Sequence, residues 1–234
     1  MTVLKGEGKV PILFGSMSVS VASRVHSGYL SRPDLTGEWP TVILVPDSSG
    51  VTPAVKDLCR KLARRELAAV AVDPLRRDRV SRLWADRQAP VSAADLDADI
   101  DDIVSFVANP SGSWSSAELG FGVLGIGAGG AAASRLTVRR PGLVVALVAA
   151  PVQPELLASA GALLGLYGRD DDGVPVDEVV AARSGLPNAE VVIYDGVGAG
   201  FIDDDSPGFD LEAATDALER LVAFFLRRLP PPPG

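Results

Sequence analysis

The chain has 234 residues, of which 47% are hydrophobic and 22% charged, enough apolar material to bury one sizeable core. Its formal net charge of −8 gives no electrostatic attraction to nucleic acid or to an anionic membrane surface, so we expect neither as a partner. The single cysteine excludes an internal disulfide framework, and we find neither a signal-peptide pattern nor an apolar run of roughly 18 residues, so we expect a cytoplasmic protein without membrane spans.

The first two expected strands lie within residues 17–30, where valines alternate with polar residues. Such alternation is typical of antiparallel strands with one solvated face, and we expect this pair at an edge of a sheet. Residues 41–45 and 68–72 are short, almost entirely apolar runs, as in strands that are buried on both faces. A polar loop, residues 47–50, follows the first of these runs.

An amphipathic helix is expected between the two buried strands. Thr52 is a suitable N-cap, Pro53 is a suitable first helical residue, and apolar residues then recur at helical spacing. Cys59 belongs to that apolar stripe. Because a buried thiol in apolar surroundings ionises poorly, we interpret Cys59 as a core residue and not as a nucleophile.

A charged cluster follows the second buried strand. Its members are Arg76, Arg77, Asp78, Arg79 and Arg82. The pattern fits either a solvated loop or an edge that binds a carboxylate, because guanidinium groups form bidentate hydrogen bonds with carboxylates. For the second reason we keep Arg77 as a candidate ligand-binding residue.

Ser92 is expected to cap a second helix, whose apolar face runs from Leu96 to Val107. Five aspartates fill its N-terminal half, where the helix dipole favours negative charge: Asp95, Asp97, Asp99, Asp101 and Asp102. They alternate around the helix and do not converge as metal ligands would. The pattern therefore predicts a solvated acidic face and not a metal site.

Residues 119–136 predict the strand, turn and helix at the centre of the fold. An apolar, glycine-rich run ends at Ile126, and small residues then open a helix at Gly127. A strained turn of this kind can lift one side chain above the sheet, beside backbone N–H groups that bind an oxyanion. Gly127 takes that position and has no side chain to present.

Three further strands are expected in the C-terminal half, at residues 143–149, 162–167 and 190–194. Two helices are expected there, one at residues 176–183 and one after Asp210. Strands that alternate with helices predict an α/β fold with a mostly parallel central sheet and helices on both faces. We find no repeat or linker, so we expect a single domain over residues 1–229. Residues 230–234 are rich in proline and are expected to form an extended, mobile tail.

The order of these motifs resembles the dienelactone hydrolase family of α/β-hydrolases over nearly the whole chain. In that family a cysteine nucleophile lies in a G-x-C-x-G-G elbow, an aspartate precedes a Val-Pro pair, and a histidine lies in a G-x-G-H-G-F loop. By this resemblance Gly127 takes the place of the nucleophile, Asp171 matches the aspartate, and Ala199 takes the place of the histidine. The resemblance implies an α/β-hydrolase fold in which two of the three triad residues are replaced.

The resemblance also places other residues near the expected site. Ser48 and Ser49 fall in the family's oxyanion loop, Ala128 follows the nucleophile position, and Asp47 matches an acidic residue near the nucleophile. As an alternative, the Asp47 carboxylate simply holds backbone amides of its own loop. The only histidine, His26, lies in the N-terminal strand region, and we interpret it as a surface or edge-strand residue.

Three functions remain open. The first is a protein without triad chemistry that binds a small organic ligand or a protein partner at the former active-site cleft. The second is an enzyme that uses Asp47 and Asp171 as acid and base, as an isomerase, cyclase, lyase or non-triad hydrolase. The third is a structural or regulatory subunit, either a homo-oligomer or paired with an active homologue. We expect no cofactor and no metal in any of them.

Overall fold

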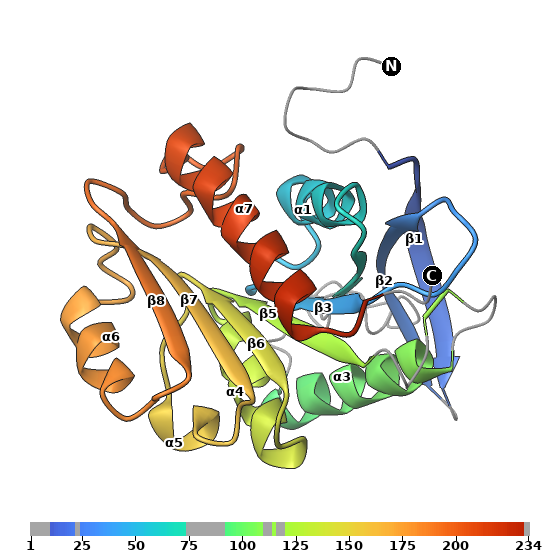
Figure 1. Cartoon of the computed structure of the whole chain (residues 1–234), viewed down its shortest axis with the longest axis horizontal. Coiled ribbons are helices and arrows are strands. Elements are labelled where there is room, and N and C mark those ends of the chain that lie inside the picture. Colours follow the sequence, from blue (N-terminus) through green and yellow to red (C-terminus); the bar gives the residue numbers. More distant parts are fainter. Residues whose placement is uncertain (1–9, 22–23, 74–91, 110–113, 116–119, 232–234) are drawn as a thin grey trace, which may run out of the picture.

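The computed structural model describes residues 10–21, 24–73, 92–109, 114–115 and 120–231. Eight strands form one sheet in the spatial order β1-β2-β4-β3-β5-β6-β7-β8 (Figure 1). The strands are β1 (Ile12–Val21), β2 (Arg24–Pro33), β3 (Thr41–Val45), β4 (Ala68–Val72), β5 (Phe121–Ile126), β6 (Val144–Val148), β7 (Ala162–Gly168) and β8 (Ala189–Tyr194). The described helices are α1 (Pro53–Ala63), α3 (Ala93–Ala108), α4 (Gly129–Arg139), α5 (Pro154–Leu157), α6 (Val176–Arg183) and α7 (Leu211–Arg228).

The sheet is antiparallel only on the side of β1 and β2. β1 pairs with β2, and β2 with β4, in antiparallel register, whereas the pairs from β4 and β3 across to β7 and β8 are parallel. The predictions of an antiparallel pair at one edge and of a mostly parallel sheet are confirmed. Parallel strands bring their carboxyl ends to one edge of the sheet, so the loops after β3, β5, β7 and β8 all leave from that edge.

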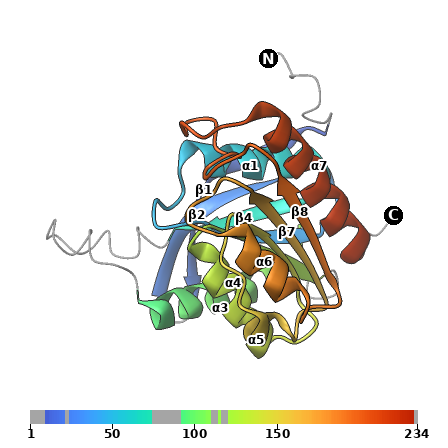
Figure 2. The same ribbon diagram turned by 90° about the vertical axis from the view of Figure 1, so that its left-hand side faces the viewer.

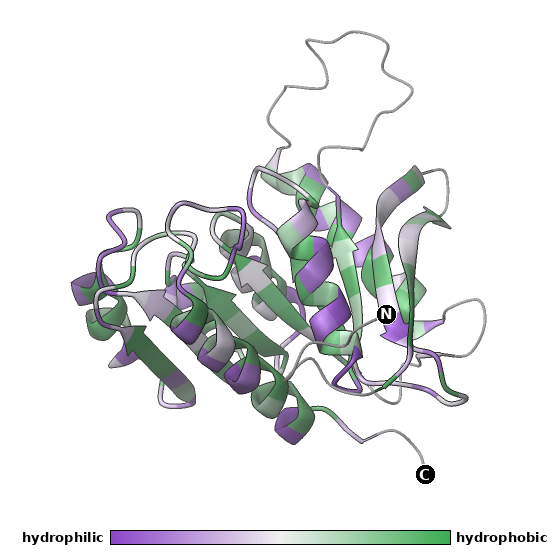
Figure 3. Cartoon of the chain, turned by 90° about the horizontal axis from the view of Figure 1, so that it is seen from above, coloured by the Kyte–Doolittle hydropathy of each residue, from purple (hydrophilic) through white to green (hydrophobic). Residues whose placement is uncertain are grey.

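Helices cover both faces of the sheet. α1 and α7 lie on one face, and α3, α4 and α5 lie on the other (Figures 1 and 2). The strands between them are largely apolar, and the helices carry polar residues on their outer sides (Figure 3). Each face therefore has its own apolar core, with Phe225 fully buried on the α7 side and Leu136 on the α4 side. Burial of this kind contributes about 25 cal/mol per Å² of apolar surface.

Three helices begin where the sequence predicts. Thr52, Ser92 and Asp210 each accept a hydrogen bond from a backbone N–H three residues on, at 3.3, 3.1 and 2.8 Å. Such caps satisfy N–H groups that the helix leaves without a partner. α4 begins at Gly129, two residues later than expected, because Gly127 has a φ of +51°, outside the helical region.

His26 is not a surface residue, and the interpretation of its environment was wrong. It lies on β2, one strand in from the edge of the sheet, and only 4% of it is exposed. Its Nδ1 lies 3.2 Å from Asp99 Oδ1, and its Nε2 lies 2.6 Å from Asp102 Oδ2. Carboxylate oxygens accept hydrogen bonds, so both contacts are hydrogen bonds only when both ring nitrogens carry a proton.

The aspartates of α3 are likewise not a uniformly solvated face. Asp99 is 2% exposed, because it lies four residues before Ile103 and so borders the apolar stripe that packs on the sheet. Asp97 pairs instead with Arg135 and Arg139 of α4, at 2.9 and 3.2 Å. The acidic residues of α3 thus connect this helix to β2 on one side and to α4 on the other.

Some expectations fall outside the described residues. These include the arginine cluster with Arg77 and residues 232–234 of the expected tail. The division into a domain of residues 1–229 and a tail of residues 230–234 stays a prediction. Within the described ranges, no helix is both long enough and apolar enough to cross a membrane.

Candidate functional site

The turn after β5 has the geometry of an elbow. Gly127 follows the last residue of the strand with a φ of +51°, and its N–H donates to the carbonyl of Val148 on the neighbouring strand (3.0 Å). The N–H of Gly130 donates to the carbonyl of Gly127 (3.0 Å), which turns the chain into α4. A left-handed φ suits glycine, because L side chains are strained there.

Close packing explains the other glycines of this turn. A Cβ atom on Gly129 would lie 2.2 Å from the carbonyl oxygen of Val45, and one on Gly130 would lie 2.4 Å from Ala150 Cβ. Neither distance is tolerated, so α4 packs against the end of β3 and the segment after β6 only with glycine at these positions. The glycine-rich sequence therefore serves the packing of the elbow, whatever residue occupies its apex.

Asp47 lies directly beside the apex. A Cβ atom on Gly127 would be 3.2 Å from Asp47 Cβ and 3.9 Å from Asp47 Oδ2. Asp47 Oδ1 accepts a hydrogen bond from the backbone N–H of Ser49 at 2.8 Å. The carboxylate thus holds its own loop with one oxygen and turns its other oxygen toward the elbow.

Asp171 and Ala199 lie on the loops that follow β7 and β8. These loops are joined by a hydrogen bond from the N–H of Asp170 to the carbonyl of Val197 (2.9 Å). Asp171 is 6% exposed, and its Oδ1 accepts a hydrogen bond from the N–H of Gly173 (2.9 Å), whereas Ala199 is exposed. Both residues leave from the same edge of the sheet as Gly127, as the parallel order requires.

The remaining candidates of this region are exposed. Ser48 and Ser49 lie on the surface of the loop after β3, and Ala128 lies on the surface between Gly127 and α4. Ala128 takes the N-cap position of α4 and makes no side-chain cap.

A small cavity lies next to the elbow. Its volume is about 60 Å³, and it is lined by Asp47, Ser49, Thr52, Ala54, Val55, Leu58, Ile126, Ile202 and Asp203. We call this space the inner cavity. Asp171 is not among these residues, so the carboxylate that shares a cavity with Asp47 is Asp203. No sequence motif pointed to Asp203, although it lies only four residues after Ala199 on the same loop.

A larger cavity of about 220 Å³, which we call the outer cavity, adjoins the inner one and shares Ala54, Leu58 and Ile202 with it. It runs between α1 and α7 and is mostly apolar. Phe209 and Leu211, which are 37% and 71% exposed, lie along it. Lys61 also lines this cavity, and its Nζ lies 2.7 Å from Asp57 Oδ2.

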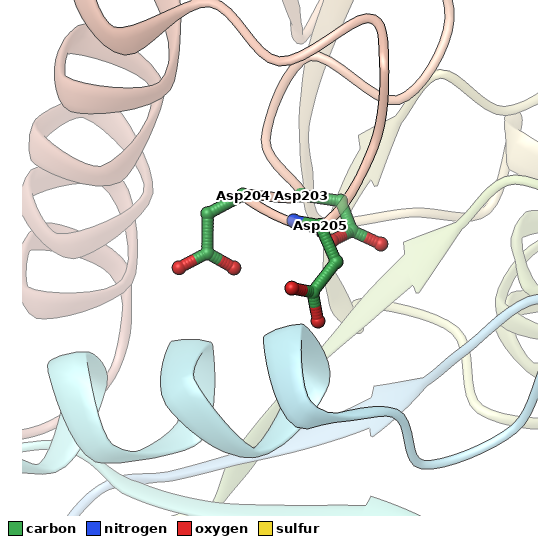
Figure 4. Close-up of side chains that lie close together, drawn as sticks. All are labelled: Asp203, Asp204 and Asp205. Carbon is green, nitrogen blue, oxygen red and sulfur yellow. Dashed lines mark hydrogen bonds between the residues drawn. The ribbon is translucent and has the colours of Figure 1, made fainter.

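Three consecutive aspartates stand above the N-terminal end of α1. In Figure 4 the side chains of Asp203, Asp204 and Asp205 project from one loop, and an oxygen of each lies within 4.8 Å of the others. Asp203 Oδ1 also accepts a hydrogen bond from the N–H of Asp205 (2.9 Å). The position has an ordinary structural reason, because the dipole of a helix stabilises carboxylates at its N-terminus.

The environment of Cys59 does not suit a nucleophile. Its side chain is fully buried on α1, and burial raises the pKa of its thiol to about 12. A thiol with that pKa stays protonated at neutral pH, and the thiol is a poor nucleophile compared with the thiolate. The interpretation of Cys59 as a core residue agrees with this environment.

The chain matches the dienelactone hydrolase family over residues 26–229. A carboxymethylenebutenolidase of Rhodococcus opacus is 30% identical over 228 residues, which cover 86% of each chain. A crystal structure titled "Putative Dienelactone Hydrolase" from Klebsiella pneumoniae is 24% identical, with a TM-score of 0.76 over 93% of this chain and 99% of the other. A dienelactone hydrolase-like promiscuous phosphotriesterase from metagenomic libraries is 17% identical, with a TM-score of 0.72 over 94% and 99%. These structures share its fold, and the match over most of its length shows that the chain belongs to the dienelactone hydrolase family.

Proposed function

We propose that this chain is a family member without a working catalytic triad, which binds a small organic molecule at the former active-site cleft. The observation that carries the proposal is the apex of the elbow. Gly127 has the left-handed backbone that would present a nucleophile, but it presents no side chain, and Asp47 stands 3.2 Å from where one would begin.

The remaining groups of the cleft support the same proposal. Ala199 has no proton-accepting group at the position that matches the family's histidine, and Cys59 is buried away from the cleft. Nucleophile and base act as a unit in this chemistry, so the loss of both leaves little acyl transfer. The surrounding frame nevertheless keeps a cavity beside the elbow and a larger apolar cavity next to it.

Binding is favoured over acid–base catalysis by Asp47 and Asp171. Asp47 lines the inner cavity, but Asp171 does not, and it turns one oxygen to the N–H of Gly173. General acid and base must both reach the reacting atoms, within about 3 Å or through one water. The third function, a structural or regulatory subunit that binds no small ligand, gives no role to the two adjoining cavities.

A screen of small organic molecules by thermal shift, repeated on two variants, tests the proposal. Ala54 lines both cavities, so Ala54→Phe is expected to fill them and to abolish the stabilisation by any ligand. Ala223 is an exposed residue of α7 that lines neither cavity, so Ala223→Phe is the matched control and should leave binding intact. Rapid acyl-enzyme formation with a dienelactone or an activated ester would overturn the proposal.

A further inference from the structure

Two carboxylates and two hydroxyl groups line the inner cavity. Asp47 and Asp203 come from two loops far apart in the sequence, and the hydroxyl-bearing residues are Ser49 and Thr52. Among the described residues that line it, none is basic. The chain as a whole carries a formal net charge of −8, so the long-range field also favours a cation here.

Each of the two carboxylates uses one oxygen in a hydrogen bond to its own loop, and its other oxygen is available to a ligand. Asp47 Oδ1 accepts from the N–H of Ser49, and Asp203 Oδ1 accepts from the N–H of Asp205. In the described part of the chain, no hydrogen bond occupies the Oδ2 atom of either residue, and Asp47 Oδ2 lies on the side of Gly127.

The outer cavity adjoins this space and is mostly apolar, with a lining that includes Leu58, Ile202, Phe209, Leu218 and Leu221. Its acidic lining residues include Asp57, Asp204 and Glu219. The one basic residue along it that the structure describes, Lys61, is held by Asp57 on the same helix. A ligand that fits both cavities therefore has a compact positive group at one end and a short apolar body at the other.

We propose that the two cavities bind a small primary amine in its ammonium form, with the ammonium group at Asp47 and Asp203 and the apolar body between α1 and α7. This inference rests on the proposed function, because it names the ligand class of the same cleft. An ammonium group donates three hydrogen bonds and gains charge-assisted contacts with carboxylates. A ligand with a carboxylate in the inner cavity would be repelled by Asp47 and Asp203, and no basic residue among the described ones that line the cavity would bind it.

Isothermal titration of the full chain with three probes of similar shape tests the inference: 2-phenylethylamine, 2-phenylethanol and phenylacetate. The amine should bind at least about tenfold more tightly than the alcohol, as expected for hydrogen bonds to charged groups, and phenylacetate should bind most weakly. Asp203→Asn should reduce the affinity for the amine to that for the alcohol. Asp205→Asn removes the same charge from the same loop but lines neither cavity, so it should leave the preference for the amine unchanged.

The possible failures can be told apart. Equal affinities for amine and alcohol, both abolished by Ala54→Phe, would overturn the ammonium site and leave the proposed function standing. Equal losses in Asp203→Asn and Asp205→Asn would also overturn it, because the preference would then come from net charge and not from contact. Titration with calcium chloride is a further control. If calcium binds to the chain, and if Asp203→Asn and Asp205→Asn weaken its binding equally, the aspartates form a metal site and the inference is wrong. Failure of the whole thermal-shift screen would instead refute the proposed function.

Discussion

At the scale of single residues, two features of Gly127 would make any other residue at this position destabilising. Its φ is +51°, and the position of a Cβ atom is already within 3.2 Å of Asp47 Cβ. Glycine at this position therefore avoids strain in the backbone of the elbow, since a residue with a side chain stores strain in that conformation.

Gly127→Ala should lower the free energy of unfolding by about 1–2 kcal/mol, the usual cost of a left-handed conformation for an L residue. Urea denaturation measures this change. Gly15→Ala is the matched control, because a Cβ atom on Gly15 meets nothing within 4 Å and its φ is not positive. An unchanged midpoint for Gly127→Ala would contradict the strain assigned to the elbow.

Cys59 should resist thiol reagents in the folded protein. Burial raises the pKa of its thiol to about 12, so thiolate is scarce at pH 8 and the reagent has no access. Labelling with a chromogenic disulfide should be slow in buffer and rapid in urea. Rapid labelling of the native chain would show that α1 opens readily or that Cys59 lies nearer the surface.

At the scale of elements, contacts between buried polar side chains join α3 to the antiparallel part of the sheet, and polar contacts join β8 to α7. His26 on β2 contacts Asp99 and Asp102 on α3. On the other side of the molecule, Tyr194 on β8 donates to Asp216 of α7 at 2.9 Å. Both connections lie between a strand near one end of the sheet and the helix that covers it.

His26→Ala should be strongly destabilising, by about 3 kcal/mol or more, because it removes the imidazole between two carboxylates in a buried site. The matched control is Arg227→Ala, which breaks the exposed pair with Glu190 and should cost less than about 1 kcal/mol. Chemical denaturation of both variants measures the difference. Similar small losses would mean that the His26 contacts contribute little to the packing of α3.

The ionisation of Asp216 should make the free energy of unfolding depend on pH in the acid range. The hydrogen bond from Arg220, together with that from Tyr194, lowers the pKa of Asp216 below its ordinary value of 3.8. A lowered folded-state pKa gives stability that is present above pH 3.8 and is lost as the pH falls through the folded-state pKa. Asp216→Asn should therefore make the melting temperature less sensitive to pH below 4. An identical acid profile in the variant would exclude this contribution.

At the scale of the whole molecule, the family fold places several loops at one edge of the sheet. The parallel strands bring Gly127, Asp171 and Ala199 to this edge. The carboxylates of Asp47 and Asp203 line the inner cavity there. A fold of this kind depends on the strand order, whereas an activity depends on a few side chains.

The double replacement Gly127→Cys with Ala199→His should restore weak ester cleavage, and the further change Asp171→Asn should abolish it. The physical reason is that nucleophile, base and orienting carboxylate act as one unit once they share the correct edge of the sheet. Activity is expected to stay low, since the new side chain would crowd Asp47. Hydrolysis of an activated ester measures it; a folded but inert double variant would show that the cleft no longer holds the triad geometry.

The local features of this protein could be predicted from its sequence. Apolar runs, helix caps and the glycine pattern of the elbow act over a few residues, so they predicted most strands, the caps at Thr52, Ser92 and Asp210, and the turn at Gly127. The match of Gly127, Asp171 and Ala199 to the family pattern is what the family resemblance implies, and it stays a prediction.

Contacts between residues far apart in the chain depend on the tertiary structure. The burial of His26 depends on how α3 packs against β2, and the cavity that Asp47 shares with Asp203 depends on where the loops after β3 and β8 lie relative to α1. Periodicity places a residue on a face of its own element, but it carries no information on which partner that face will contact. For this reason the sequence pointed to Asp47 with Asp171, whereas the structure brings Asp47 and Asp203 to one cavity.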